Sequence, residues 1–249
     1  MSASFCIYCG LNSWLQDGYW PTQHSYEILL LMKPVLIINP NGSQQTTQDM
    51  VGITSEYLPK VIGWTNHNGP KMIVDQEQLN EAANQITEAV FPDASALIVA
   101  AFGDPGAKSL SRVMDIPVIG IGAAAAREAS LGKASFAVVT TTPRLAPSIN
   151  TLMQAEGGNT YLGCYSTEGD PLILASNSKT LDHALITSCE IARKAGAERV
   201  IIGGGPLGAA AIRISPQVNV SLIQPLVAAS REVSVFIQHS LSHVQDVYQ

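Results

Sequence analysis

A pattern of strand and turn residues recurs in this chain at an offset of about 100 residues. In each copy an apolar run is followed by polar, glycine or proline residues that favour a turn. Three pairs of segments repeat in this way: 37–41 with 138–142, 97–101 with 200–204, and 117–121 with 218–223. A duplicated pattern of this length predicts two similar lobes.

Between these segments, short runs rich in β-branched residues alternate with stretches of helical spacing. The clearest predicted helices are 75–90, 143–155 and 178–195, with Asp75 and Ser178 at N-cap positions. This alternation is typical of parallel sheets flanked by helices, and several runs are apolar on both faces, as buried parallel strands are. The predicted strands are 35–38, 61–65, 96–100, 118–121, 136–140, 160–164, 200–202 and 218–223.

The repeat and the alternation together predict an α/β protein with two pseudo-symmetric lobes, each built on a mostly parallel four-stranded sheet. We assign residues 32–122 plus 225–249 to the first lobe and 123–224 to the second. Open α/β sheets bind ligands beyond the carboxyl ends of their strands. We therefore expect the repeated turns to meet at one active-site cleft between the lobes.

The first segment of the chain differs from the rest. Residues 1–31 have no sustained period, and we expect them to be an N-terminal extension without fixed structure. Cys6 and Cys9 have the spacing of half a zinc site, but Cys164 and Cys189 stand alone far downstream. Because a structural zinc site needs four converging ligands, we predict no metal site.

Charge and hydropathy narrow the function classes. The net charge of −6 provides no basic surface for nucleic acid or an anionic membrane. The densest apolar run, 28–38, is interrupted by Lys33 and is shorter than the ~20 residues of a spanning helix. Four cysteines in 249 residues favour a reducing compartment, so the cytoplasm is the expected location. The sequence is compatible with a homo-oligomer and does not determine the oligomeric state.

Five motifs occur in a fixed order: 38–43 (INPNGS) with Met50, 100–106 (AAFGDPG), 117–121, 138–141 and 202–205. In order and spacing they resemble the hydantoin and allantoin racemase branch of the aspartate/glutamate racemase superfamily, over about residues 32–240. The resemblance implies a two-lobed fold and an isomerase that acts on amino acids or their derivatives without a cofactor.

The same resemblance shows where this chain departs from the family. The family uses two opposed cysteines, one in each lobe: one thiolate removes a proton from carbon and the facing thiol returns one. Ala101 occupies the first cysteine position and Gly204 the second, and neither residue carries a transferable side-chain proton. The resemblance therefore implies the fold and the cleft, whereas the standard two-cysteine mechanism cannot operate.

Polar residues and glycines at the predicted strand ends are candidates for substrate binding. Asn41 and Thr141 suit a carboxylate or a ureide, although such side chains also form hydrogen bonds within their own turns. Free backbone N–H groups around Gly204 suit an anion. The candidate substrate-binding residues are Asn41, Ser43, Ala101, Phe102, Gly103, Thr140, Thr141, Gly204 and Gly205.

Asp104 is the ionisable side chain within these loops, and we take it as the candidate catalytic residue. A carboxylate near a helix N-terminus is expected to cap the helix, with a lowered pKa. The alternative is a general base for proton removal from carbon.

Two other glycine motifs are discounted. The segment 203–208 fits the G-x-G-x-x-G dinucleotide pattern, but the next acidic residue, Glu232, lies beyond the following strand. The segment 106–109 lacks the glycine that precedes the lysine of a phosphate-binding loop. We therefore predict no cofactor.

These observations favour a cofactor-independent racemase-family enzyme that acts on a small carbon acid bearing a carboxylate or a ureide. Two alternatives remain open. One is a non-catalytic binding protein or degenerate family member. The other is a lyase or hydrolase that uses backbone donors and water on the same scaffold.

Overall fold

The structure, a computed structural model, describes residues 33–247, with side chains as far as residue 239. The predictions for residues 1–31 lie outside this range. The strands are β1 (Val35–Asn39), β2 (Val61–Thr65), β3 (Ala96–Val99), β4 (Val118–Gly120), β5 (Phe136–Thr140), β6 (Tyr161–Ser166), β7 (Arg199–Gly203) and β8 (Ser221–Ile223). The α-helices are α3 (Gln44–Ser55), α4 (Gln76–Thr87), α5 (Ala107–Leu110), α6 (Ile121–Ala129), α7 (Ala146–Gly157), α8 (Pro171–Ala175), α9 (Ser178–Lys194), α10 (Gly208–Ile214) and α11 (Pro225–Val247).

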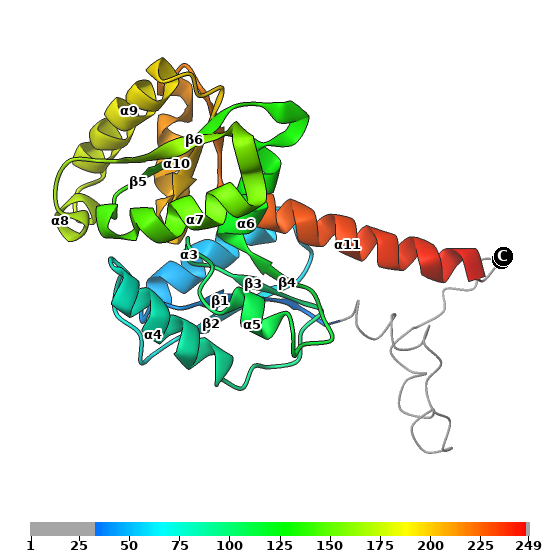
Figure 1. Cartoon of the computed structure of the whole chain (residues 1–249). Helices are drawn as coiled ribbons and strands as arrows, with labels where there is room; N and C mark the ends of the chain where they lie inside the picture. The colour runs from blue at the N-terminus through cyan, green and yellow to red at the C-terminus, as the bar shows by residue number, and fades with distance from the viewer. Residues whose placement is uncertain (1–32, 248–249) are drawn as a thin grey trace, which may run out of the picture.

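The strands form two sheets of four, ordered β2-β1-β3-β4 and β6-β5-β7-β8. Every pairing in both sheets is parallel. The two orders are the same when β5 is matched to β1 and each later strand to its counterpart. Figure 1 shows the sheets in two lobes, with α4 on the first and α9 on the second. The predicted pair of pseudo-symmetric α/β lobes is therefore confirmed.

Several predicted boundaries are corrected by one or more residues. Strand β6 runs from Tyr161 to Ser166 and not over 160–164. The N-cap of α9 is Asn177, whose side chain accepts a hydrogen bond from the backbone of Thr180; Ser178 is already the first helical residue. Asparagine and serine cap helices about equally well, so propensity alone does not choose between neighbours. Asp75 caps α4 as predicted.

Two helices that position the site, α3 and α6, are not predicted by apolar periodicity in the sequence. Helix α3 buries Thr47, Met50 and Thr54, so two of its three buried side chains are polar. Helix α6 is alanine-rich and buried around most of its circumference, and its first residue, Ile121, was assigned to the preceding strand. Helix α6 begins directly after β4 with Gly120 at its N-cap and no capping side chain, so no residue marks its start in the sequence.

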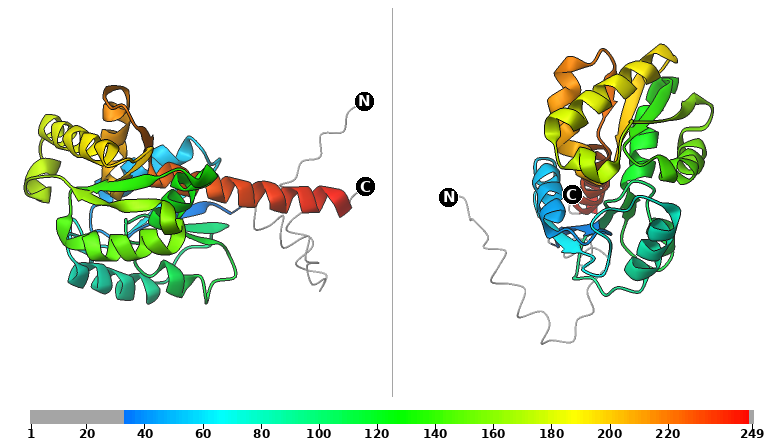
Figure 2. Two further views of the ribbon diagram at one scale, coloured as in Figure 1. Left: turned by 45° about the horizontal axis from the view of Figure 1, so that its top comes forward. Right: turned by 90° about the vertical axis from the view of Figure 1, so that its left-hand side faces the viewer.

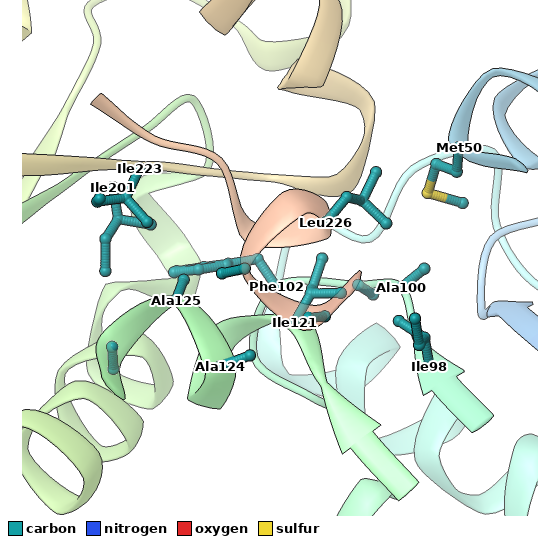
Figure 3. Close-up of a cluster of buried hydrophobic side chains, with 14 of the residues drawn as sticks. Met50, Ile98, Ala100, Phe102, Ile121, Ala124, Ala125, Ile201, Ile223 and Leu226 are labelled. Atoms are coloured by element: carbon teal, nitrogen blue, oxygen red, sulfur yellow. The ribbon is translucent and has the colours of Figure 1, made fainter. Parts of the chain in front are cut away.

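An apolar cluster joins the two lobes. Figure 3 shows Phe102 at its centre, with Ile201 and Ile223 of the second sheet on one side and Ile98 and Ala100 of the first lobe on the other. Helices α6 and α11 pack against each other and against strands of both sheets, so the lobe boundaries at 122 and 225 stay predictions. The shared core holds the carboxyl ends of the two sheets together.

Beyond its buried start, α11 extends away from the body of the molecule (Figures 1 and 2). Among the described residues, no helix is long and apolar enough to cross a membrane.

Candidate functional site

The turns that follow β3 and β7 touch each other between the lobes. A Cβ added to Gly203 would lie 2.9 Å from Cε1 of Phe102, and one added to Gly205 would lie 2.7 Å from the carbonyl oxygen of Ala100. Such approaches leave no room for a side chain, which explains why glycines stand here. The repeated turns therefore converge, as the sequence predicts.

A pocket of about 50 Å³ lies where these turns meet. Both lobes form its walls, which consist of Asn41, Met72, Ile73, Ala101, Phe102, Thr141, Thr142, Leu145, Gly203, Gly204, Gly205, Pro206 and Leu207. None of these lining residues of the described chain has an ionisable acid or base in its side chain.

Asn41 brings to this pocket a buried side-chain acceptor without a protein partner. Its side chain is 4% exposed, and its Oδ1 atom accepts no hydrogen bond. The turn is instead held by Asn39, whose Oδ1 accepts from the backbone N–H of Asn41 at 3.0 Å and whose Nδ2 donates to Thr47 at 2.9 Å. A buried acceptor without a partner is costly in a folded protein, and it is readily explained by a bound ligand.

The structure separates the predicted site residues into two groups. Those that line the pocket are Asn41, Ala101, Phe102, Thr141, Gly204 and Gly205. Ser43 instead caps α3, with its Oγ accepting from the backbone N–H of Thr46 at 3.2 Å. Thr140 is fully buried and donates to the carbonyl oxygen of Gly203 at 2.9 Å, and Gly103 has a φ of +110° beside Leu79. These three are absent from the pocket wall.

Sequence reasoning missed several wall residues. Thr142 ends a motif segment, and Leu145 follows it closely, so the motif itself was a usable signal. Met72 and Ile73 lie in the loop between β2 and α4, where no period or motif marks them. Their place in the wall depends on tertiary packing.

Asp104 lies outside the pocket wall and caps helix α6. Its two carboxylate oxygens accept from the backbone N–H groups of Gly122 and Ala123, each at 2.7 Å. Helix α6 has no side-chain cap of its own because Gly120 occupies its N-cap position. A Cβ on Gly120 would lie 2.3 Å from Cγ of Asp104, so the carboxylate rests directly on the backbone. The general-base role of Asp104 stays a prediction.

Burial raises the pKa of Asp104 to about 7, because desolvation of the carboxylate outweighs the lowering by Gly122, Ala123 and Arg127. The expected lowering of this pKa is therefore wrong. A carboxyl whose pKa is higher in the folded than in the unfolded chain binds its proton more tightly when folded. This group should therefore make the free energy of unfolding fall as the pH rises from about 4 to about 7.

Urea unfolding of the unsubstituted chain and Asp104→Asn between pH 5 and pH 8 tests this prediction. The difference in unfolding free energy between the unsubstituted chain and Asp104→Asn should change with pH. The carboxyl of Asp104 titrates and the amide that replaces it does not, while the other titrating groups contribute equally to both proteins. Parallel pH profiles for the two proteins would contradict the raised pKa.

The described cysteines do not belong to the pocket. Cys189 is buried within α9 and Cys164 lies on β6, and burial raises the pKa of each thiol to about 12. Thiols with such a pKa are protonated near neutral pH and are poor bases. Within residues 33–239, no group of three or more His, Cys, Asp or Glu side chains is placed to hold a metal ion.

Fold and pocket together define a two-lobed α/β protein with a pocket between pseudo-symmetric parallel sheets. Residues 35–233 match the family described as Asp/Glu/Hydantoin racemase, and the chain belongs to this family. It is 28% identical over 211 residues to a hydantoin racemase of Paenarthrobacter aurescens, covering 79% of this chain and 88% of that protein. The resemblance inferred from the motifs is thus confirmed.

Solved structures agree with the fold. The allantoin racemase from Pseudomonas fluorescens superposes with a TM-score of 0.76 at 21% identity, covering 82% of this chain and 91% of that chain. The allantoin racemase from Klebsiella pneumoniae gives a TM-score of 0.73, also at 21% identity, over 83% and 88% of the two chains. The assignment of Ala101 and Gly204 to the cysteine positions stays a prediction.

Proposed function

We propose that the chain binds a small cyclic ureide in the pocket between its lobes and does not racemise it by a two-thiol route. One observation carries the proposal: the pocket presents an unpaired amide acceptor and no ionisable side chain. The site thus offers groups that recognise a ligand and lacks groups that exchange protons with carbon near neutral pH.

The chemistry of Asn41 favours a ureide over a carboxylate. A carboxamide presents an acceptor and donors side by side, and the N–H and C=O of a cyclic ureide match them. An ionised carboxylate has acceptors alone and would leave Oδ1 of Asn41 unpaired. No lysine or arginine of the described chain lines the pocket to balance a negative charge. The hydantoin racemase among the relatives supports the same class of ligand.

Proton transfer from carbon needs a base whose pKa lies near the working pH. The hydroxyl groups of Thr141 and Thr142 and the carboxamide of Asn41 do not meet this requirement. The two-base route of the family uses two thiols, and Ala101 and Gly204 carry none.

Replacing Asn41 with alanine should weaken the binding of hydantoin about tenfold, which corresponds to about 1.4 kcal/mol. The melting temperature should stay unchanged or rise, because Oδ1 of Asn41 makes no hydrogen bond within the protein. Isothermal titration calorimetry and thermal unfolding measure the two effects.

Asn219→Ala is the matched control, because Asn219 is exposed in the turn before β8 and lies outside this pocket. It should leave hydantoin affinity unchanged. The proposal is wrong if the unsubstituted chain does not bind hydantoin, or if Asn41→Ala binds it equally well.

A further inference from the structure

Met72 differs from the other large side chains that line the pocket. Phe102, Ile73, Leu145 and Leu207 are each less than a tenth exposed and are held by the surrounding core. Met72 is half-buried, so part of its side chain reaches solvent while part lines the pocket. It therefore lies where the pocket meets the surface.

The segment that carries Met72 is tied to the opposite lobe. Asp75 at the start of α4 pairs with Arg144 of the second lobe at 3.8 Å, and the Ser148 hydroxyl of α7 donates to Oε1 of Gln76. Both contacts join the start of α4 to the start of α7 and its preceding turn, on one side of the molecule (Figure 1). Met72 lies three residues before Asp75 in this segment.

The pocket of about 50 Å³ is lined closely from both lobes, so a large substituent on a bound ring requires part of the wall to move. Methionine is unbranched and has three rotatable side-chain bonds, so it adapts to a new neighbour more easily than buried branched or aromatic residues do. The exposed contacts beside it are of a kind that contributes little to stability. Among the large side chains of the wall, Met72 therefore changes conformation most easily.

We propose that Met72 determines the size of the ring substituent that the pocket accepts. The inference rests on the proposed function, because it assumes that a cyclic ureide occupies this pocket. With Met72 in place, the space beside the ring is filled and large substituents are disfavoured. Removal of its side chain opens that space without touching Asn41.

The test compares the dissociation constants of hydantoin and 5-benzylhydantoin, each enantiomer separately, by calorimetry. The unsubstituted chain should prefer hydantoin, and Met72→Ala should reduce this preference at least tenfold. Met72→Leu, which keeps most of the volume, should retain it. Met114→Ala is the matched control, because Met114 packs against the outer cluster of the first sheet and lies outside the pocket wall.

The outcomes separate the two proposals. If the unsubstituted chain and Met72→Ala bind hydantoin with the same preference over 5-benzylhydantoin, the inference about Met72 is overturned and the proposed function stands. An equal shift in Met114→Ala would also overturn it, since the effect would then be general loosening. If the unsubstituted chain does not bind hydantoin, both proposals fail.

Discussion

The double variant Ala101→Cys, Gly204→Cys is expected to exchange the ring-carbon proton of a 5-substituted hydantoin with solvent in heavy water and to racemise it. Residues 101 and 204 line the same pocket, one from each lobe. A thiolate on one side can take the proton while the thiol on the other side delivers a deuteron, and the two then exchange roles. Position 101 is 7% exposed, and burial raises the pKa of a thiol, so the exchange is measured at pH 8 and above, where the ionised fraction is larger.

The two substitutions differ in their expected effect on stability. Ala101 already has a Cβ, so cysteine adds one sulfur atom at a position that is 7% exposed. Gly204 has a φ of +159°, at the edge of the region that favours glycine, and its Cβ would lie 3.0 Å from Cδ1 of Leu207. A leucine side chain can shift by a few tenths of an ångström, but the positive φ strains any residue with a Cβ, so we expect a loss of about 1–3 kcal/mol and the double variant is first checked for folding.

Nuclear magnetic resonance detects deuterium uptake, and circular dichroism detects racemisation. Each single variant should exchange slowly with little inversion, because one face of the ring gains a base and the other does not. The unsubstituted chain is the control for thiols elsewhere, since it contains Cys164 and Cys189 outside the pocket. A folded double variant that binds hydantoin without exchange would contradict the assignment of the two positions.

Racemisation by the unsubstituted chain at the rate of the double variant would contradict the proposed function itself. The proton would then be carried by another group, and Asp104 would be the first to replace. Its effect on activity would have to be compared with its effect on stability, because its carboxylate caps α6.

Gly205→Ala should abolish binding of hydantoin and lower the free energy of unfolding by about 1–3 kcal/mol. The new Cβ would lie 2.7 Å from the carbonyl oxygen of Ala100 and 3.2 Å from Sδ of Met50. The first of these is a backbone atom, so no rotamer change relieves the contact. The β7 turn must move away from the β3 turn, which displaces Gly204 and the pocket wall.

Gly52→Ala is a control that should raise the free energy of unfolding, whereas Gly205→Ala should lower it. Gly52 lies within α3, and a Cβ there would meet nothing within 4 Å. Alanine in a helix interior is more favourable than glycine by about 0.5–1 kcal/mol, so this variant should be stabilised and should bind hydantoin normally. Urea unfolding and calorimetry of both variants provide the measurements. Equal stability of the two variants would show that the lobes do not meet as described.

Much of the fold could be predicted because its strands are marked by residues that are neighbours in the chain. The runs around Val35 and Phe136 are apolar on both faces and end in turn residues, which is sufficient to predict buried parallel strands. Their repetition then predicts two matching sheets. Helix α6 could not be predicted in this way, because it begins directly after β4 with Gly120 at its N-cap and no capping side chain to mark its start.

The candidate site was predictable where it lies next to a motif. Asn41, Ala101 and Gly204 follow strands whose ends must meet in an open α/β fold, and they line the pocket. Ser43 follows a strand equally closely, yet its hydroxyl is used to cap α3. Strand-end position therefore selects the neighbourhood of a site, and hydrogen bonding decides which side chains remain free for a ligand.

The sequence by itself determined the two-lobed α/β architecture and the absence of thiols at residues 101 and 204, because both follow from residue identity and order along the chain. The tertiary structure alone decided that Asp104 caps α6, that Oδ1 of Asn41 has no partner and that Met72 lines the pocket. These features depend on distances between residues far apart in the chain. Such distances are set by how the two lobes pack together, which no local pattern encodes.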